Sequence, residues 1–263
     1  MRFVMWSAGH YLLMLAPALI MTALYFLLRK RSDKVKYIVG VVIGIISLGI
    51  LLLRNIDIYL SEGFCPGIIP LQVCHFGNIM VFVALVFRSK TAASIAWCLN
   101  MIAAFGSLIV ADDLADYMTI WAIRPQTYIW GHIFIVLGAL YTVIMKIVRI
   151  DLRSFFCGVA VLFALLMPAI ILNSYFNDVC GLDCNYFYIY NSDGVPFEPL
   201  YIGERAQYGW FTINWTYTIL VVVLAFAVMF AIFNIQRLLY LKDKDYKTYN
   251  IFTAARMKRR AQV

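Results

Sequence analysis

The sequence predicts an all-α polytopic membrane protein, a bundle of seven transmembrane helices. Of its 263 residues, 63% are hydrophobic and only 14% are charged, and the mean hydropathy is +0.83. This composition excludes an ordinary soluble domain. Seven apolar runs are long enough to cross a bilayer, which takes roughly 20 helical residues, and no run alternates as a barrel strand would.

The seven runs define the domain organisation. We expect one transmembrane domain over residues 1–236 and a basic cytoplasmic tail over residues 237–263. The first run has no basic flank before it and no A-x-A site after it, so we expect it to be retained as a helix. The expected spans cover about residues 6–28, 37–53, 66–87, 91–111, 127–148, 154–175 and 210–233.

The distribution of Lys and Arg predicts the orientation. Eighteen of these 22 residues lie in alternate connections and in the tail, whereas the opposite connections hold 10 of the 14 Asp and Glu residues. Because basic residues stay on the cytoplasmic side, we expect the N-terminus outside and the C-terminus inside. The net charge of +8 is then a topology signal, and it does not indicate a nucleic-acid partner.

One long connection, residues 176–209, lies on the predicted outer side. It is rich in aromatic residues and contains the turn signals "NSDG" and "EP". Connections of this length are either functional or disordered. Since so aromatic a segment is a poor free linker, we expect it to pack back onto the helix ends as a lid.

The cysteines divide by their predicted side of the membrane. Cys65, Cys180 and Cys184 fall in outer connections, where one disulfide among the three is allowed and the sequence does not choose the pair. Cys98 and Cys157 lie within helices, where cysteine behaves as a small apolar residue. "CGLDC" could suggest a metal, but it lacks a second pair of ligands, so we expect no metal there.

Polar and ionisable groups are costly inside a bilayer, so each one within a span is a functional candidate. Most of them share the outer half of the predicted bundle, which indicates a polar cavity open to that side. The alternative is that each group separately bridges two helices. The candidates are His10, Cys74, Asn78, Asp112, Asp113, Asp116, His132, Asn173 and Asn214.

The third span offers a nucleophile. Proline favours the first turn of a helix, so Pro70 predicts a helix start that places Cys74 in the second turn, near the positive end of the helix dipole. That position favours a thiolate. Asn78 shares the face of Cys74, whereas His75 points about 100° away and is a poor base for its neighbour. His132, at a compatible depth, is the better base.

A thiol and an imidazole together suit covalent catalysis through a thioester. In a cavity that faces lipid, the obvious carbonyl is a phospholipid ester. The alternative is a buried cysteine that lies near a buried histidine by chance. "DDLAD", residues 112–116, makes a competing case, because its spacing would place carboxylates on one helix face for Mg²⁺ bound to a diphosphate. We find no second such cluster, and a solvated helix end explains the run equally well, so we expect no cofactor.

Several short motifs in order carry a family resemblance. "IIPLQVC" opens the third span, "VADD" ends the fourth, "WGHIFIVLGALY" opens the fifth, "CNYFYIY" precedes the last, and His10 lies in the first. Over roughly residues 6–233 the chain resembles the YwaF-like bacterial membrane proteins, which are related to transmembrane protein 164 of animals. Gln72 stands where the bacterial pattern usually has histidine, and Ile133 where glycine is frequent.

The resemblance implies a seven-helix protein of the bacterial cytoplasmic membrane that moves acyl chains between phospholipids with a cysteine and a histidine. These two roles fall on Cys74 as nucleophile and His132 as base. Beside the resemblance, we expect Asn78 to be the oxyanion donor. The acceptor would be a lysophospholipid or the amino group of a lipoprotein. The residues expected to bind the headgroup or acceptor are His10, Gln72, Asp112, Asn185 and Tyr186.

Two readings of other classes remain open. A binding or transport protein could hold a lipid or a small polar ligand in the same outer cavity without chemistry, although the chain shows no repeated halves of the kind that many transporters have. A partner subunit without a site of its own is the third possibility. A retinal protein is disfavoured, because the last span has no lysine for a Schiff base.

Overall fold

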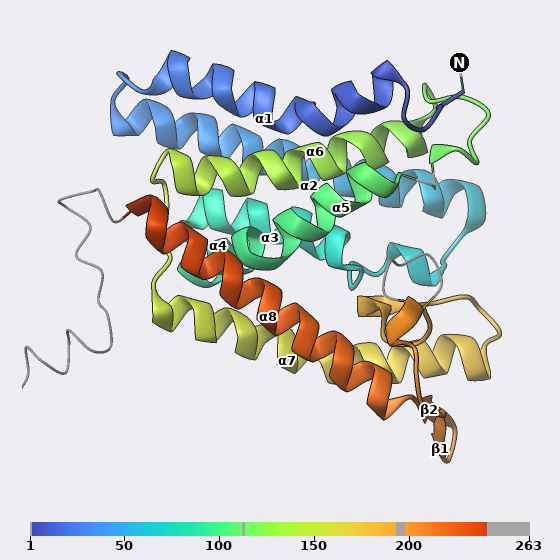
Figure 1. The fold of residues 1–263 in the computed structure, drawn as a ribbon. Helices are drawn as coiled ribbons and strands as arrows, with labels where there is room; N and C mark the ends of the chain where they lie inside the picture. The colour runs from blue at the N-terminus through green and yellow to red at the C-terminus, as the bar shows by residue number, and fades with distance from the viewer. Residues whose placement is uncertain (1, 112–113, 193–197, 241–263) are drawn as a thin grey trace, which may run out of the picture.

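The computed structural model describes residues 2–111, 114–192 and 198–240. Within these ranges, seven helical segments are long and apolar enough to cross a membrane, so the predicted number of membrane helices is confirmed, and the orientation of the termini stays a prediction. The helices lie side by side along one direction (Figure 1). The predictions for Asp112, Asp113 and most of the basic tail concern residues outside the described ranges.

The chain alternates between the two ends of the bundle. The end at which α1 begins is called the N-terminal end here; α3, α6 and α8 also begin there, and the long connection before α8 lies there (Figure 1). The membrane helices are α1 (Ala8–Leu28), α2 (Asp33–Glu62), α3 (Val73–Phe87), α4 (Lys90–Ile95) with π-helical η2 (Ala96–Asn100) and α5 (Met101–Val110), α6 (Ile123–Ile144), α7 (Leu152–Ser174) with π-helical η4 (Tyr175–Val179), and α8 (Trp215–Tyr240). The shorter elements are the 3-10 turns η1 (Pro66–Ile68), η5 (Tyr186–Tyr188) and η6 (Glu198–Leu200), and the antiparallel strands β1 (Ala206–Tyr208) and β2 (Phe211–Ile213).

Helix α2 is longer than the sequence predicts. The expected span ended at residue 53, but α2 continues without a break to Glu62 and stops at Gly63, whose φ of 77° favours glycine. Two further helical turns follow the predicted end because no proline or glycine interrupts "RNIDIYLSE". Arg54 is therefore part of a membrane helix and not of a connection.

The start of α3 also differs from the prediction. Regular helix begins at Val73, and not at Pro70, because Pro70 forces Ile69 into extended backbone and Gln72 is extended as well. Pro66 instead opens the separate turn η1. Cys74 therefore lies in the first turn of α3 rather than in the second.

Helix α5 ends before the acidic run. Its last residue is Val110, and Ala111 is left-handed, with φ of 38°. Asp116 follows in a non-helical turn and is exposed. The expectation that the "DDLAD" spacing would place carboxylates on one helix face is therefore wrong for Asp116.

Helix α6 is the centre of the bundle, and it packs against α1, α2, α3 and α5. Its close approach to α3 requires glycine, since a Cβ at Gly138 would lie 2.3 Å from Cγ1 of Val81. Tyr141 of α6 fills the space beside Gly40 of α2 and donates a hydrogen bond to the Lys36 carbonyl at 2.7 Å. Tight packing therefore leaves little room on this side of α3.

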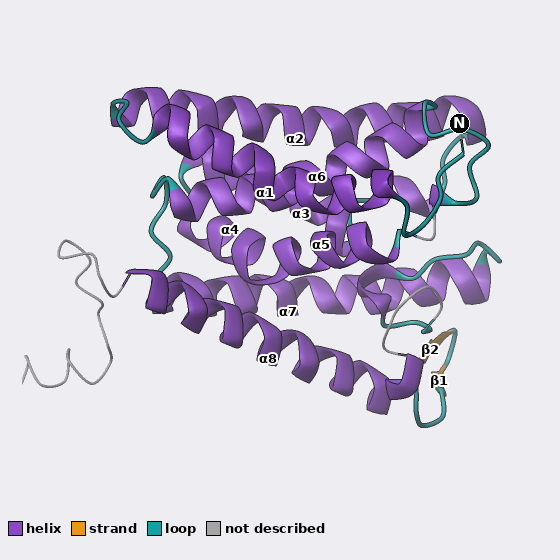
Figure 2. Cartoon of the chain, turned by 45° about the horizontal axis from the view of Figure 1, so that its top comes forward, coloured by secondary structure: helices purple, strands orange, loops and turns teal. Residues whose placement is uncertain are grey.

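Helices α7 and α8 form the looser side. They meet at the far end of the bundle, where the Phe155 and Phe233 rings lie 4.9 Å apart, and they diverge toward the N-terminal end (Figure 2). Near that end, the described part of the long connection packs back onto α7 through Phe176, Cys184, Tyr186 and Ile189. The divergence leaves a space between α7, α8 and the α3–α5 layer.

Candidate functional site

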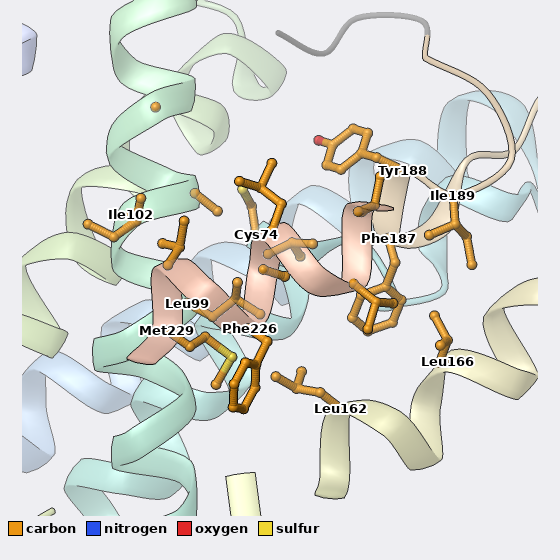
Figure 3. A pocket seen from close by; sticks show the side chains of 18 of the residues that line it. Cys74, Leu99, Ile102, Leu162, Leu166, Phe187, Tyr188, Ile189, Phe226 and Met229 are labelled. Carbon is orange, nitrogen blue, oxygen red and sulfur yellow. The ribbon is translucent and has the colours of Figure 1, made fainter. Parts of the chain in front are cut away.

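A cavity of about 390 Å³ fills the space between α3, the η2–α5 segment, α7 and α8. This volume lies within the range of small-molecule sites. Its walls are almost wholly aliphatic and aromatic (Figure 3), and the lining residues with polar side-chain atoms are Cys74, Ser107 and Tyr188. Representative wall residues are Leu99, Ile102, Leu162, Leu166, Phe226 and Met229. The cavity therefore suits an alkyl chain better than a polar ligand.

Three consecutive residues of the long connection close one side of this cavity. Phe187, Tyr188 and Ile189 line it, and Phe187 and Tyr188 both adopt a φ of 54°, a conformation that costs most side chains free energy. Their neighbour Tyr186 anchors them, because its backbone N–H donates to Asn173 Oδ1 at 2.6 Å and its hydroxyl donates to the Pro66 carbonyl at 2.6 Å. The connection thus joins α7 to the turn that precedes α3.

The structure gives Asn185 and Tyr186 anchoring roles. Asn185 donates to Asn191 O at 3.0 Å and accepts from the Tyr190 N–H at 3.0 Å, so its amide holds the connection in shape. The sequence predicted that Asn185 and Tyr186 would bind substrate. The residues that line the cavity are instead Phe187, Tyr188 and Ile189. The sequence could not single them out, because aromatic residues recur along this whole segment.

Cys74 is buried at the N-terminal end of the cavity, in the first turn of α3. Its sulfur lies 3.6 Å from the Ser107 hydroxyl, which donates its one hydrogen to the Ala103 carbonyl at 3.1 Å. Ser107 can therefore accept a hydrogen bond from the thiol. The first bond of the helix runs from the Phe76 N–H to the Gln72 carbonyl, and no side chain caps the first turn. Such a turn stabilises negative charge near the sulfur.

His132 is buried on α6 with one ring nitrogen held in place. Nδ1 lies 2.7 Å from the Tyr128 carbonyl, which can only accept, so Nδ1 carries the proton and Nε2 holds the lone pair. Nε2 makes no hydrogen bond to the described part of the chain. The Tyr128 ring packs 4.3 Å from the imidazole, and its hydroxyl donates to the Ser107 carbonyl at 2.9 Å. Contacts through Ser107 and Tyr128 therefore connect Cys74 to His132.

Asn78 serves the contact between helices. Its Oδ1 accepts from the Ser47 hydroxyl at 2.8 Å, and its Nδ2 donates to the Cys74 carbonyl at 3.2 Å. The side chain is buried between α2 and α6 and is not among the residues that line the cavity. The structure thus places Asn78 as a helix bridge, the alternative reading, and leaves its predicted oxyanion role without support.

His10 is a second helix bridge. Nδ1 accepts from the Trp6 N–H at 2.9 Å, and Nε2 then donates to the Leu108 carbonyl at 2.9 Å. The side chain is fully buried, and both ring nitrogens are used. It fastens the start of α1 to α5, away from the lining of the cavity.

The remaining predicted residues fall into separate places. Gln72 precedes α3, and its buried Oε1 finds no hydrogen-bond partner in the described ranges. Asp112 lies outside these ranges. The described residues hold no cluster of three His, Cys, Asp or Glu side chains that could bind a metal ion.

All six cysteines are free thiols in the structure. Of the three proposed for one disulfide, Cys65 is half-buried, Cys180 is exposed and Cys184 is buried. Burial raises the pKa of the Cys184 thiol to about 11, and its sulfur donates to Asn173 Oδ1 at 3.4 Å. The structure therefore gives Cys184 a role in anchoring the connection.

The sequence did not single out Arg54, Ser107 or Tyr128. Arg54 was placed in a connection because α2 was predicted too short. Tyr128 is four residues before His132, so it shares that residue's helix face, and this spacing could have identified it. Ser107 gave no signal, because a serine in an apolar helix commonly bonds its own backbone.

Comparison of the chain with protein-family models gives a match. The model of the TMEM164 family matches residues 5–234, which is most of the chain. Searches of curated proteins and of solved structures find no match.

Proposed function

We propose, from the premise that this chain belongs to the TMEM164 family, that it is a membrane acyltransferase. It would be a YwaF-like member of the family that takes a fatty acyl chain from a phospholipid through a Cys74 thioester, in a cavity at the outer leaflet of a bacterial cytoplasmic membrane. One observation carries the proposal: the Cys74 sulfur lies in the wall of an alkyl-sized cavity within the membrane helices. An acyl chain in that cavity would bring its ester to the thiol.

The proposed reaction has two displacement steps. His132 Nε2 takes the thiol proton, and the sulfur attacks the ester carbonyl to form a tetrahedral intermediate. The carbon–oxygen bond breaks, His132 returns its proton to the leaving lysophospholipid alkoxide, and a thioester remains. The hydroxyl of a second lysophospholipid, or a lipoprotein amine, then attacks the thioester with His132 as base, and protonated sulfur is restored.

Backbone groups offer the oxyanion site in this mechanism. The Asn78 side chain is already hydrogen-bonded to the Ser47 hydroxyl. The backbone N–H groups of Val73 and His75 come before the first hydrogen bond of α3, and they donate to no described residue. A helix N-terminus presents its N–H groups and its dipole to an anion without reorganisation. We therefore place the developing oxyanion at the first turn of α3.

A second function is favoured by the cavity lining. The walls are nearly all apolar, and two of the polar side chains predicted to face the cavity, His10 and Asn78, bond other helices instead. A protein that binds or transports a lipid without chemistry would have the same lining. Covalent labelling separates the two functions.

The test uses the purified full-length chain in nanodiscs that contain a phospholipid with a radiolabelled acyl chain. We expect an acyl adduct on the protein that hydroxylamine removes at neutral pH, and we expect Cys74→Ala to abolish it. Cys157→Ala, at an exposed cysteine of α7, is the matched control and should keep the adduct. An adduct that persists in Cys74→Ala would refute the mechanism. Bound lipid released unchanged, with no adduct at any time, would favour the binding protein.

A further inference from the structure

Arg54 is an arginine within a membrane helix, and three of its five N–H donors make no hydrogen bond to the described residues. Its Nη1 donates to Asn55 Oδ1 at 3.1 Å and to the Gly67 carbonyl at 3.0 Å, which uses both hydrogens of that nitrogen. Nε and Nη2 donate to no residue in the described ranges. These two nitrogens form the edge of a guanidinium that binds a carboxylate or phosphate through two parallel hydrogen bonds.

Two acids of α2 are ion-paired with Arg124 and not with Arg54, and Glu62 acts on Arg54 only as a charge within electrostatic range. Arg124 takes both, with Nε 3.1 Å from Asp57 Oδ2 and Nη1 2.5 Å from Glu62 Oε1. Arg54 makes no ion pair with the described residues. An arginine in a membrane helix ordinarily faces a partner or an aqueous path, so one without a direct ion pair points to an anion supplied from elsewhere.

Two histidines from neighbouring helices lie within electrostatic range of Arg54. His75 of α3 is within range of both Arg54 and His132, and His132 of α6 is within range of Arg54. The three helices α2, α3 and α6 pack on one another in pairs. The buried Nδ1 of His75 finds no hydrogen-bond partner in the described chain, so it too has bonding capacity for a ligand.

Cys74 and His75 are consecutive, so their side chains leave α3 about 100° apart. Cys74 faces the apolar cavity, and His75 is not among the residues that line it. The first turn of α3 therefore separates an apolar region from a region with donors and positive charge. A phospholipid has the same division, since its phosphodiester is a few bonds from its ester carbonyls.

We propose that Arg54 and His75 bind a phosphate oxyanion, the phosphodiester of the phospholipid donor. Nε and Nη2 of Arg54 meet two phosphate oxygens, and His75 donates to one of them. This inference rests on the proposed function. It places the ester beside Cys74 while the acyl chain enters the cavity, and it makes Arg54 a determinant of specificity for phospholipids over neutral lipids.

The test measures binding, which does not depend on turnover. The full-length Cys74→Ala protein in neutral detergent micelles is titrated with a fluorescent phosphatidylglycerol and with a fluorescent diacylglycerol of the same acyl chains. We expect the phospholipid to bind at least tenfold more tightly. In the same background, Arg54→Gln should weaken phospholipid binding about 10- to 100-fold, the range of a charge-assisted pair, and leave diacylglycerol binding unchanged. Arg54→Lys should give an intermediate loss, because lysine keeps the charge and loses the paired donors.

Arg124→Gln is the matched control, because this arginine is already ion-paired. It should leave the ratio of phospholipid to diacylglycerol affinity unchanged. Equal affinities for the two lipids in the Cys74→Ala protein overturn the inference. This outcome needs no Arg54 variant, so it can be measured even if the Arg54 variants misfold. An equal loss of both lipids in a monodisperse Arg54→Gln protein overturns it as well.

Inorganic phosphate distinguishes the source of the anion. If phosphate at millimolar concentration binds the protein in an Arg54-dependent way while the two lipids bind equally, the site takes free phosphate and the lipid assignment is wrong. The acyl-adduct experiment stays separate. An adduct without phospholipid preference would refute only the phosphate site, whereas preference without an adduct would refute only the catalysis.

Discussion

Two buried histidines near the N-terminal end of the bundle differ in how many of their ring nitrogens the protein uses. His10 has both nitrogens in hydrogen bonds, to the Trp6 N–H and the Leu108 carbonyl. His132 has only Nδ1 engaged by the described chain, at the Tyr128 carbonyl. Both residues lie at a similar depth, but hydrogen bonds within the fold use both ring nitrogens of His10, whereas His132 keeps one basic nitrogen. Unused bonding capacity therefore marks a candidate site better than depth does.

The same comparison applies to the arginines. Arg124 directs Nε to Asp57 and Nη1 to Glu62, whereas Arg54 leaves its Nε and Nη2 edge unused by the described residues. Buried polar groups are nearly always bonded, so groups that are not require an explanation. Arg54 and His132 lie within electrostatic range of each other, beside the first turn of α3. This clustering is what a ligand site would produce.

The largest expected effect is on His132. His132→Asn keeps a donor for the Tyr128 carbonyl and removes Nε2, so we expect acyl-adduct formation to slow about 10²- to 10⁴-fold with little loss of stability. Rapid quenching of the labelled nanodisc reaction measures the rate. His10→Asn is the control and should retain the wild-type rate per folded molecule. A wild-type rate in His132→Asn would remove the imidazole from the mechanism.

The next effect is on the stability that His10 provides. His10→Phe preserves the ring and leaves the Trp6 N–H and the Leu108 carbonyl without this partner, so we expect a loss of about 1–3 kcal/mol in unfolding free energy. Denaturant titration in micelles measures this loss, and the adduct assay on the remaining folded protein should give the wild-type rate. If the rate falls while stability is kept, His10 belongs to the site, as the sequence predicted.

How far the sequence could go is clear from particular residues. It identified Cys74 and His132 as the candidate nucleophile and base, because residue type and depth in an apolar span can be read from one segment. It could not tell Asn78 from His132, because the Ser47 hydroxyl that bonds Asn78 lies on another helix, α2, whose packing against α3 cannot be read from one segment. The Tyr128 carbonyl that bonds His132 lies on the same helix, four residues earlier, but the sequence does not show that the other ring nitrogen stays unused. Arg54 was not predicted as a site residue, because its positive charge was taken as the end of the second span, whereas α2 continues for two more turns.

The smallest expected effect tests the role of Asn78. The Ser47 hydroxyl and Asn78 Oδ1, 2.8 Å apart, should couple by about 0.6 kcal/mol in a cycle of Ser47→Ala, Asn78→Ala and the double variant, the average for hydrogen bonds between membrane helices. Unfolding in micelles gives this coupling, and the adduct assay gives the rate of each variant. We expect rates within about threefold of wild type, because the first turn of α3 is the proposed oxyanion site. Loss of an oxyanion donor costs about 10²- to 10³-fold, so a loss of that size in Asn78→Ala alone, with Ser47→Ala unaffected, would return Asn78 to the catalytic role that its sequence position suggests.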